Sequence, residues 1–523
     1  MNILFITADQ WRGACLSRLG HPVVKTPNLD YLSENGVTFT QHYAQTAPCA
    51  PSRTSMHTGM YLQNHRCVVN GTPIDRRFTN WAIEVRKKGY KPSLFGYTDS
   101  AMDPRGLNPE DRRLTHYSEP LAGIDSFTPI YDDVSLSWVE YLRNCGYPLT
   151  EKPWDYYGNT KPGIEWEDGG PVPLPLAIGA NDHETRFMTD ACIDWIKDQN
   201  SPWITHLSLL RPHPPFVAPE PYNSMYDPLL VDGIVRQPSV KRESQQHPYL
   251  DFILNAKEYG ATSSKYRAPD NEQEILRKKA SYYGLMTEVD DQLGRLFKYL
   301  KQSDQWHNTF IIFTSDHGEQ MGDHWLMGKS GYFDQSYHIP LIIRDPRPQG
   351  EKCHGKTVNA FTENVDLMPT ILEFVGLPIP SQCDGYSLEP FLSHQRSPVY
   401  WRNEVHWEFD FREWFDPTLL KHLKLTPHQC TLNVIRDNEF KYVHFTALPP
   451  LFFDLKNHPD EDVDLASNPE YQGIVLEYAQ KMLSWRMHHD DRGLTETFLS
   501  KSGPIRRYSP LHPLGLAPGT TSV

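Results

Sequence analysis

Three near-continuous apolar segments, far apart in the sequence, each pass directly into polar residues. They are residues 2–8, followed by Asp9; residues 203–210, followed by Arg211 and His213; and residues 309–314, followed by Ser315 and Asp316. Apolar runs without alternation are typical of strands buried on both faces, as in a parallel sheet covered by helices. Because ligands gather beyond the carboxyl ends of such strands, we expect these polar residues to share one site.

Helices are expected between these strands. Apolar residues recur at helical spacing over residues 283–300, which predicts a helix with one buried face. A second helix is predicted over residues 365–375, with Pro369 in its first turn, where a missing N–H costs little. The expected fold class is therefore α/β, with a mostly parallel sheet flanked by helices.

The composition changes near residues 383–398, and a different pattern follows. Residues 431–436 and 440–445 predict a hairpin, residues 451–455 predict another strand, and residues 471–485 predict an amphipathic helix. We expect a smaller C-terminal α+β domain here. The predicted division is a catalytic domain over residues 1–385, the smaller domain over residues 386–499, and a tail or oligomerisation arm over residues 500–523.

Charge and cysteine usage exclude several classes of protein. The formal net charge of −14 over 523 residues argues against a general nucleic-acid binder, which would have a basic face. The first apolar run is too short to span a membrane and has no basic lead or cleavage site. The eight cysteines are scattered without paired spacing, which favours reduced thiols over disulfides. These features predict a cytoplasmic protein that binds neither nucleic acid nor membrane.

The segment Cys49-Ala50-Pro51-Ser52-Arg53, which continues to Thr58-Gly59, resembles the signature of the sulfatase family. In that family a maturation enzyme oxidises the cysteine to formylglycine. The hydrated aldehyde, held on a metal, attacks phosphorus or sulfur. The resemblance implies that Cys49 is the precursor of the nucleophile. Arg53 would hold that group and offset negative charge, and a helix beginning at Pro51 would add its dipole. The alternative is that Cys49 is a small buried thiol.

Two pairs of donor residues at strand ends predict one divalent metal ion. Asp9-Gln10 follows the first apolar run and Asp316-His317 follows the last, and the oxidised Cys49 would complete the shell. Common sulfatases carry Asp-Asp and Asp-Asn at these places. This chain has one carboxylate fewer and one imidazole more, which favours manganese, zinc or iron over calcium. The alternative is that each aspartate caps a helix.

Several segments resemble bacterial phosphonate monoester hydrolases, enzymes of the alkaline phosphatase superfamily that also cleave phosphodiesters. The segments are residues 9–12, 61–66, 211–216, 314–320 and 328–332, and the resemblance covers nearly the whole chain except the tail. It implies an alkaline-phosphatase-like fold with Asn70, Tyr97, His213 and Lys329 around a small anionic ester. Lys329 and His213 would donate to non-bridging oxygens or protonate the leaving oxygen, and Asn70 and Tyr97 would donate hydrogen bonds.

Asp99 departs from these relatives, which carry a threonine at its position. Inside the pocket, Asp99 would act as a base and repel dianions such as phosphate monoesters more than monoanions. Alternatively it caps a loop and points away. With the first orientation, we expect a promiscuous enzyme for phosphodiesters, phosphonate monoesters and sulfate monoesters.

Other functions remain open on the sequence alone. One is an arylsulfatase with promiscuous phosphonate and phosphodiester activity, although the Lys-x-His element of common arylsulfatases is missing near Asp99. Others are a group transferase, disfavoured because the formylglycine ester collapses to free product, and an inactive binding protein on the same scaffold. A homo-oligomer, either dimer or tetramer, is expected from the resemblance.

Overall fold

Eight strands form the central sheet. The computed structural model describes residues 1–161, 173–262, 266–393, 401–412, 416–491, 494–495 and 497–506. The strands are β1 (Asn2–Ala8), β2 (Val37–Tyr43), β3 (Ser93–Gly96), β4 (Asp125–Pro129), β5 (Ile204–Leu209), β6 (Thr309–Thr314), β7 (Leu341–Arg344) and β8 (Lys356–Glu363). Their order across the sheet is β4-β3-β5-β1-β6-β7-β2-β8.

The sheet is mostly parallel, as predicted. The strands β4, β3, β5, β1 and β6 run in one direction, and β7 is antiparallel to both of its neighbours. The three apolar runs singled out in the sequence are β5, β1 and β6, which lie side by side in the middle of the sheet. Their register places Thr7 of β1 opposite Ser208 of β5 and Thr314 of β6. The polar residues after these strands therefore emerge at one edge.

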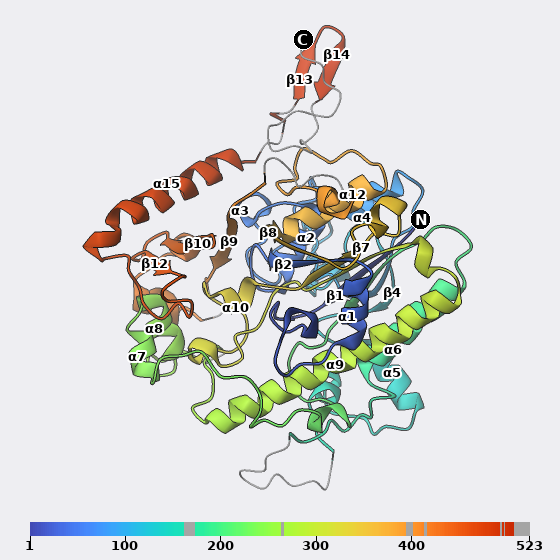
Figure 1. Cartoon of the computed structure of the whole chain (residues 1–523), viewed down its shortest axis with the longest axis horizontal. Coiled ribbons are helices and arrows are strands. Elements are labelled where there is room, and N and C mark those ends of the chain that lie inside the picture. Colours follow the sequence, from blue (N-terminus) through green and yellow to red (C-terminus); the bar gives the residue numbers. More distant parts are fainter. Residues whose placement is uncertain are drawn as a thin grey trace.

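Helices cover both faces of this sheet (Figure 1). One face packs against α1 (Pro27–Glu34), α5 (Leu136–Asn144), α6 (Glu184–Lys197) and the long α9 (Glu272–Gln302), and the other packs against α2 (Cys49–Thr58), α4 (Trp81–Arg86) and α12 (Leu367–Phe374). Alternate side chains of β1 enter the two cores: Leu4 and Ile6 on the α9 side, Ile3 and Phe5 on the α4 side. Burial on both faces explains why β1 has no polar alternation.

Both predicted helices are present. The first is the C-terminal part of α9. The second, α12, begins at Leu367 rather than Val365, and Pro369 lies in its first turn. A short 3-10 turn, Asn364–Asp366, precedes α12, and the reciprocal side-chain bonds of Glu363 and Asp366 close that turn.

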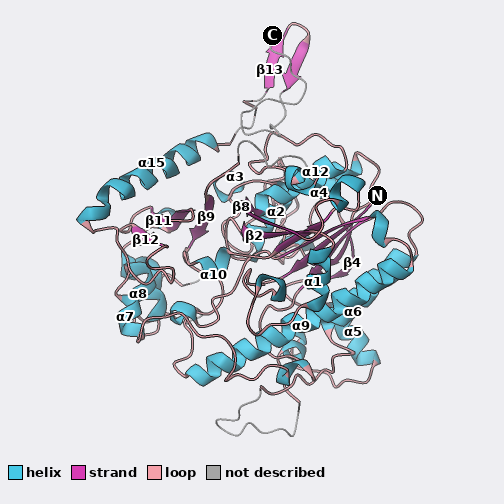
Figure 2. Ribbon diagram, viewed as in Figure 1, coloured by secondary structure: helices cyan, strands magenta, loops and turns pink. Residues whose placement is uncertain are grey.

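A second, smaller sheet follows in the chain (Figure 2). Its strands β9 (Val405–Asp410), β10 (Thr431–Arg436), β11 (Phe440–Phe445) and β12 (Leu451–Asp454) are antiparallel in the order β12-β11-β10-β9. The expected hairpin is β10 and β11. Helix α15 (Gln472–His488) lies against this sheet and buries Tyr478 and Met482. An α+β unit therefore follows the α/β unit, as expected.

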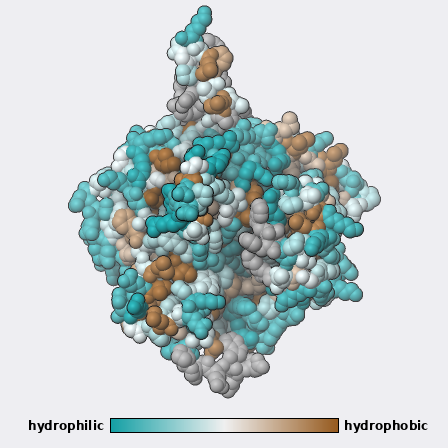
Figure 3. Space-filling view, turned by 180° about the vertical axis from the view of Figure 1, so that it is seen from behind, coloured by the Kyte–Doolittle hydropathy of each residue, from teal (hydrophilic) through white to brown (hydrophobic). Residues whose placement is uncertain are grey.

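The C-terminal segment projects from the body as a hairpin of β13 (Thr497–Ser500) and β14 (Gly503–Arg506) (Figure 1). The side chains of Phe498 and Leu499 on it are 69% and 77% exposed. Residues 507–523 of the expected arm lie outside the described residues. The surface opposite to the view of Figure 1 is mainly hydrophilic with separate small apolar patches (Figure 3). None of the described helices combines the length and apolarity needed to cross a bilayer.

A buried ionic network joins the two sheets. Lys441 of β11 is fully buried, and its Nζ lies 3.0 Å from Asp334 Oδ1 and also bonds Glu461. Asp334 is the first residue of α10 (Asp334–Tyr337), which lies between β6 and β7 in the chain. Its Oδ2 accepts from Arg436 Nε of β10 at 2.9 Å. The network therefore joins the strand hairpin of the small sheet to the part of the chain that forms the large sheet.

Replacing Lys441 with methionine should lower the free energy of unfolding by about 3–5 kcal/mol, because the buried carboxylate of Glu461 would lose its cation and the part-exposed Asp334 would keep only Arg436. The matched control is Lys456→Met, which removes the exposed ion pair with Glu439 and should cost at most about 1 kcal/mol. Chemical denaturation of the two variants checks this. An equal decrease in the free energy of unfolding in both variants would show that the Lys441 network stabilises the fold no more than an exposed ion pair does.

Candidate functional site

Cys49 is the first residue of α2, directly beyond the sheet edge. The helix begins two residues earlier than the start predicted at Pro51. Pro51 is accommodated because it lies in the first turn, where its missing N–H would have no helical partner in any case. Asn70 accepts the Ala50 N–H through Oδ1 at 3.0 Å. A backbone N–H only donates, so the Asn70 amide nitrogen is left free to face the space around Cys49.

Four potential ligand groups converge at Cys49. Atoms of Asp9, Cys49, Asp316 and His317 all lie within 4.8 Å of one another, and all four residues are buried. Asp9 follows β1, whereas Asp316 and His317 follow β6. The shared site expected from separate strand ends is thus present, with the cysteine motif in it.

Arg53 lies behind this cluster and bridges its two carboxylates. Its Nη2 donates to Asp9 Oδ2 at 3.0 Å and its Nε donates to Asp316 Oδ2 at 2.9 Å. Its Nη1 donates to the Tyr97 carbonyl and to Ser208 Oγ. The guanidinium is completely buried and is committed to these partners, so it positions the carboxylates instead of facing a ligand.

The remaining acceptor atoms fit a bound cation. His317 Nδ1 lies 3.0 Å from the Gly318 carbonyl, which only accepts, so this nitrogen carries the proton. Burial lowers the pKa of His317, so the ring is neutral and Nε2 offers a lone pair. Asp9 Oδ1 is buried without a hydrogen-bond partner among the described residues. Burial raises the pKa of Asp9, but Lys329, His317 and Arg53 outweigh this and hold it below its usual value. Unprotonated nitrogen and oxygen donors gathered in this way suit a divalent metal ion.

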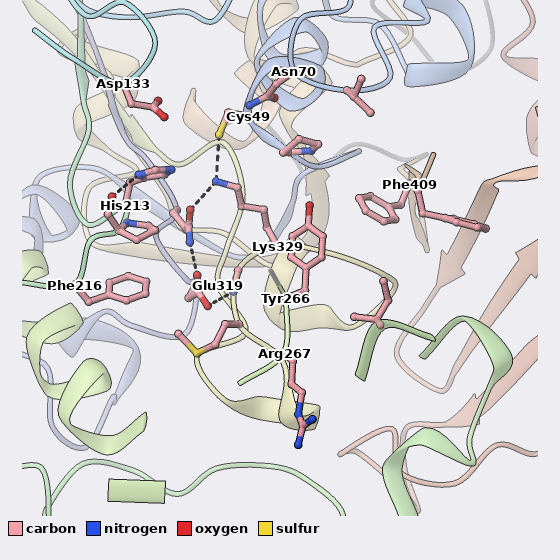
Figure 4. Close-up of a pocket in the computed structure, with 18 of the residues that line it drawn as sticks. Cys49, Asn70, Asp133, His213, Phe216, Tyr266, Arg267, Glu319, Lys329 and Phe409 are labelled. Atoms are coloured by element: carbon pink, nitrogen blue, oxygen red, sulfur yellow. Dashed lines mark hydrogen bonds between the residues drawn. The ribbon is translucent and has the colours of Figure 1, made fainter. Parts of the chain in front are cut away.

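Both polar atoms of the Gln10 side chain are hydrogen-bonded. Its Oε1 accepts from Lys329 Nζ at 2.7 Å and its Nε2 donates to Glu319, while its backbone N–H bonds Asp316 Oδ1. Lys329 Nζ also lies 3.2 Å from Cys49 Sγ, as the dashed lines of Figure 4 show. Burial alone would lower the pKa of Lys329, but Cys49, Asp9 and Asp316 raise it by a larger amount. The pKa therefore lies above its usual value, and the ammonium stays charged beside the nucleophile position.

Cys49 lies on the wall of a cleft of about 840 Å³. Asn70, His213 and Lys329 also line it, so three of the four residues expected around the substrate face the same space. The rest of the wall is largely apolar and aromatic, and includes Phe216, Tyr266, Met327, Phe409 and Phe411. The small sheet therefore contributes to the cleft, through Phe409 of β9 and the residues after it.

Tyr97 and Asp99 lie beyond β3, behind the cleft wall. The Tyr97 hydroxyl donates to Asp9 Oδ2, and its ring lies 4.1 Å from the Arg53 guanidinium. Asp99 is 1% exposed, and its Oδ1 has no hydrogen-bond partner among the described residues. Burial raises the pKa of Asp99 to about 8. Its carboxylate caps no backbone N–H in the described part of the chain, so it is not a loop cap there.

His213 is held in place by its own loop. Its Nδ1 lies 2.7 Å from the Pro214 carbonyl, so Nδ1 is protonated and Nε2 is the nitrogen available to a ligand. The buried Arg211 donates through Nη1 to the carbonyls of His213 and Pro215 at 2.7 and 3.1 Å. Burial and the nearby Lys329 lower the pKa of His213 well below its usual value.

Sequence reasoning missed several residues of this site. Glu319 was inside a segment already singled out, but only the structure shows its bond to Gln10. Asp133 and Tyr117 line the cleft without any recognisable motif around them. Phe409 comes from β9, a strand that was not predicted although residues 405–410 are all buried. The apolar and aromatic residues of 405–411 were an available signal for that strand.

Known proteins resemble this chain over nearly its whole length. A sequence model of the sulfatase family matches residues 1–377, and one for the C-terminal part of N-sulphoglucosamine sulphohydrolase matches residues 322–488. The multifunctional alkaline phosphatase superfamily protein PehA of Trinickia caryophylli is 41% identical over 518 residues, which is 97% of this chain and 99% of that protein. An arylsulfatase of Clostridium perfringens is 27% identical over 506 residues, 95% of this chain and 96% of that one.

Two solved structures are similar throughout. The phosphonate monoester hydrolase of Agrobacterium radiobacter has a TM-score of 0.89 and 41% identity, and that of Silicibacter pomeroyi has a TM-score of 0.88 and 36% identity. Each comparison covers 97% of this chain and 99% of the other. The predicted fold, with its mostly parallel sheet and smaller C-terminal antiparallel sheet, agrees with theirs.

Chelation should lower the midpoint of thermal unfolding, because a cation that binds only the folded state stabilises it. The Asp9→Asn variant should hold less metal and respond less to chelator. Asp30→Asn, which alters a carboxylate bonded to Ser17 far from the cluster, should respond as the wild type does. Elemental analysis and thermal scans measure both quantities. A wild-type midpoint unchanged after complete metal removal would contradict a cation at this cluster.

Proposed function

This chain belongs to the sulfatase family, and we propose that it cleaves monoanionic phosphonate monoesters and phosphodiesters, with sulfate monoesters as promiscuous substrates. It is an ester hydrolase, in keeping with that family. The observation that carries the proposal is the position of Cys49 at the start of α2, against the ligand groups of Asp9, Asp316 and His317 and beside Lys329. A buried thiol serving only as packing would not need charged and metal-ligating neighbours on this scale.

The described residues fit the two groups that the family implies. Asp9, Asp316 and His317 would hold one divalent metal ion, with Gln10 and the side chain at position 49 beside it. Oxidised to formylglycine by a maturation enzyme, Cys49 would supply a hydrated aldehyde as nucleophile, activated by the metal. The nitrogen donor of His317 supports manganese, zinc or iron over calcium. Elemental analysis that finds stoichiometric calcium alone would contradict this preference.

The cleft residues would bind and orient the ester. Lys329 is charged and lies beside Cys49, so it would donate to a non-bridging oxygen or to the leaving oxygen. The amide nitrogen of Asn70 would donate a neutral hydrogen bond. His213 would present Nε2, which in the neutral ring accepts a hydrogen bond, so protonation of the leaving oxygen by His213 would require the imidazolium form, which its lowered pKa disfavours. Arg53 and Tyr97 would act one layer back, by fixing the carboxylates of the metal site.

A second candidate function is that of an arylsulfatase with secondary phosphonate and phosphodiester activity. The match to the Clostridium perfringens arylsulfatase over 95% of the chain supports it. Substrates of both kinds share size and charge, so the same oxygen-binding groups would serve them. Catalytic efficiencies on aryl sulfates and phenyl phosphonates distinguish the two. The group transferase and the inactive binding protein gain no support from the cleft, which assembles nucleophile, metal ligands and proton donors together.

Other features stay proposals. The exposed Phe498 and Leu499 of the C-terminal hairpin support a homo-oligomer, a dimer or a tetramer, in which residues 500–523 contact a neighbour. The division into residues 1–385 and 386–499 is supported by the two separate sheets. The cytoplasmic location stays a prediction from the sequence.

Cys49→Ala and Cys49→Ser should each lower kcat by at least ~10³-fold, because loss of a nucleophile removes the covalent route. Cys67→Ser, at a buried thiol outside the metal cluster, is the control that should keep activity. Peptide mass spectrometry across position 49 should detect the aldehyde in active wild-type protein. Full activity in protein that retains the thiol, or in the alanine variant, would refute the proposal.

Lys329→Met should lower kcat/KM by roughly 10²–10³-fold on all monoanionic esters, since it removes a buried donor aimed at developing charge. Lys278→Met is a suitable comparison because Lys278 also lines the cleft but is paired with Glu274 and part-exposed. We expect it to change kcat/KM by no more than about threefold. Steady-state kinetics on one phosphodiester and one phosphonate monoester measure both effects, and equal losses would contradict the role of Lys329.

A further inference from the structure

Asp133 is an acidic residue on the wall of a cleft that takes anions. It lines the cleft together with Cys49, Asn70 and Tyr117, and in Figure 4 Asp133 and Asn70 flank Cys49. Its side chain makes no hydrogen bond or ion pair with the described residues. A carboxylate without a partner at this place contributes nothing evident to stability, so its charge acts on whatever enters the cleft.

The backbone holds Asp133 in this position. Tyr131 and Val134 exchange backbone hydrogen bonds across a two-residue turn of Asp132 and Asp133, both with positive φ, 48° and 65°. Such a turn suits asparagine and glycine better than most residues. It is anchored by the bond from Asp132 N–H to Ser118 Oγ and by α5, which begins after Ser135. The turn aims one carboxylate into the cleft and leaves the other, Asp132, exposed.

Acidic side chains outnumber basic ones around the nucleophile position. Two basic side chains, Arg53 and Lys329, face five acidic ones: Asp9, Asp99, Asp133, Asp316 and Glu319. With every carboxylate ionised, a divalent cation at the ligand cluster would bring the formal sum to −1, and to 0 while the buried Asp99 holds a proton. Asp133 is the member of this set that lines the cleft and makes no hydrogen bond or ion pair with the described residues, whereas Glu319, which also lines it, is bonded to Gln10 and to two backbone N–H groups. A substrate with two negative charges would therefore meet uncompensated repulsion there, whereas a monoanion would meet half of it.

We propose that Asp133 is a specificity-determining residue that discriminates against dianionic esters such as phosphate monoesters, in favour of monoanionic ones. The proposal rests on the hydrolase function proposed above. The sequence analysis expected Asp99 to repel dianions. The proposal assigns that role to Asp133 instead, a residue that the sequence did not single out. Asp99 is buried and does not line the cleft, whereas Asp133 does.

The test compares two substrates with the same leaving group. Bis(p-nitrophenyl) phosphate is a monoanion, and p-nitrophenyl phosphate is a dianion at pH 8. In Asp133→Asn, the ratio of kcat/KM for the dianion to that for the monoanion should rise about tenfold to a hundredfold, the size of one unit-charge interaction at a partly hydrated site. Asp133→Gly, which also removes the charge and fits a positive φ, should give the same shift. Asp133→Glu should keep the wild-type preference for the monoanion.

The matched control is Asp132→Asn, which makes the same change in the same turn but on the exposed side chain. Its substrate ratio should stay within about twofold of wild type. Metal content and thermal midpoint, measured on every variant, identify any that misfold. An unchanged ratio in folded, metal-loaded Asp133→Asn and Asp133→Gly would overturn the role of Asp133. A wild-type enzyme that cleaves neither the diester nor a phosphonate monoester would instead overturn the function proposed above.

Discussion

The centre of this molecule depends on one buried cation, the guanidinium of Arg53. It joins Asp9, at the end of β1, to Asp316, at the end of β6, in a region without solvent. Two carboxylates buried side by side would otherwise repel each other and take up protons. With both carboxylates bound to Arg53, Asp9 Oδ1 and Asp316 Oδ2 lie 3.9 and 3.7 Å from His317 Nε2, so negatively charged oxygen atoms remain next to a nitrogen donor. The same interaction fixes α2, and hence position 49, against the sheet edge.

Much of this arrangement could be predicted from the sequence because its causes are local. A strand buried on both faces must be apolar throughout, so β1, β5 and β6 are visible as runs, and residues after them must meet at one edge. The cysteine motif then identifies the chemistry. Strand β4 has no such signature, since it is short, lies at the edge of the sheet and is partly exposed. The turn after it, with Asp133, was therefore not visible as part of the site.

The orientation of side chains is a second thing that sequence could not supply. Gln10 follows Asp9, a candidate metal ligand, in the chain, yet its amide is held between Lys329 and Glu319, residues more than three hundred positions away. Tyr97 was expected at the substrate, but its hydroxyl donates to the carboxylate of Asp9, in the candidate ligand cluster. Such outcomes depend on which hydrogen-bond partners burial brings together, because a buried polar group takes a partner wherever one is available. Neither spacing nor residue type contains that information.

Five adjacent parallel strands, β4, β3, β5, β1 and β6, each deliver site residues beyond their carboxyl ends. The two inner ends, of β1 and β6, provide groups that are fully buried and bonded to one another, so a change in one disturbs the rest. The outer ends and the small sheet provide Asp133, Phe409 and other side chains of the cleft wall that have few such bonds. Substitutions in the cleft wall could therefore change the substrate preference with little effect on the buried centre. The residues that carry out the reaction would then be separate from those that select the ester.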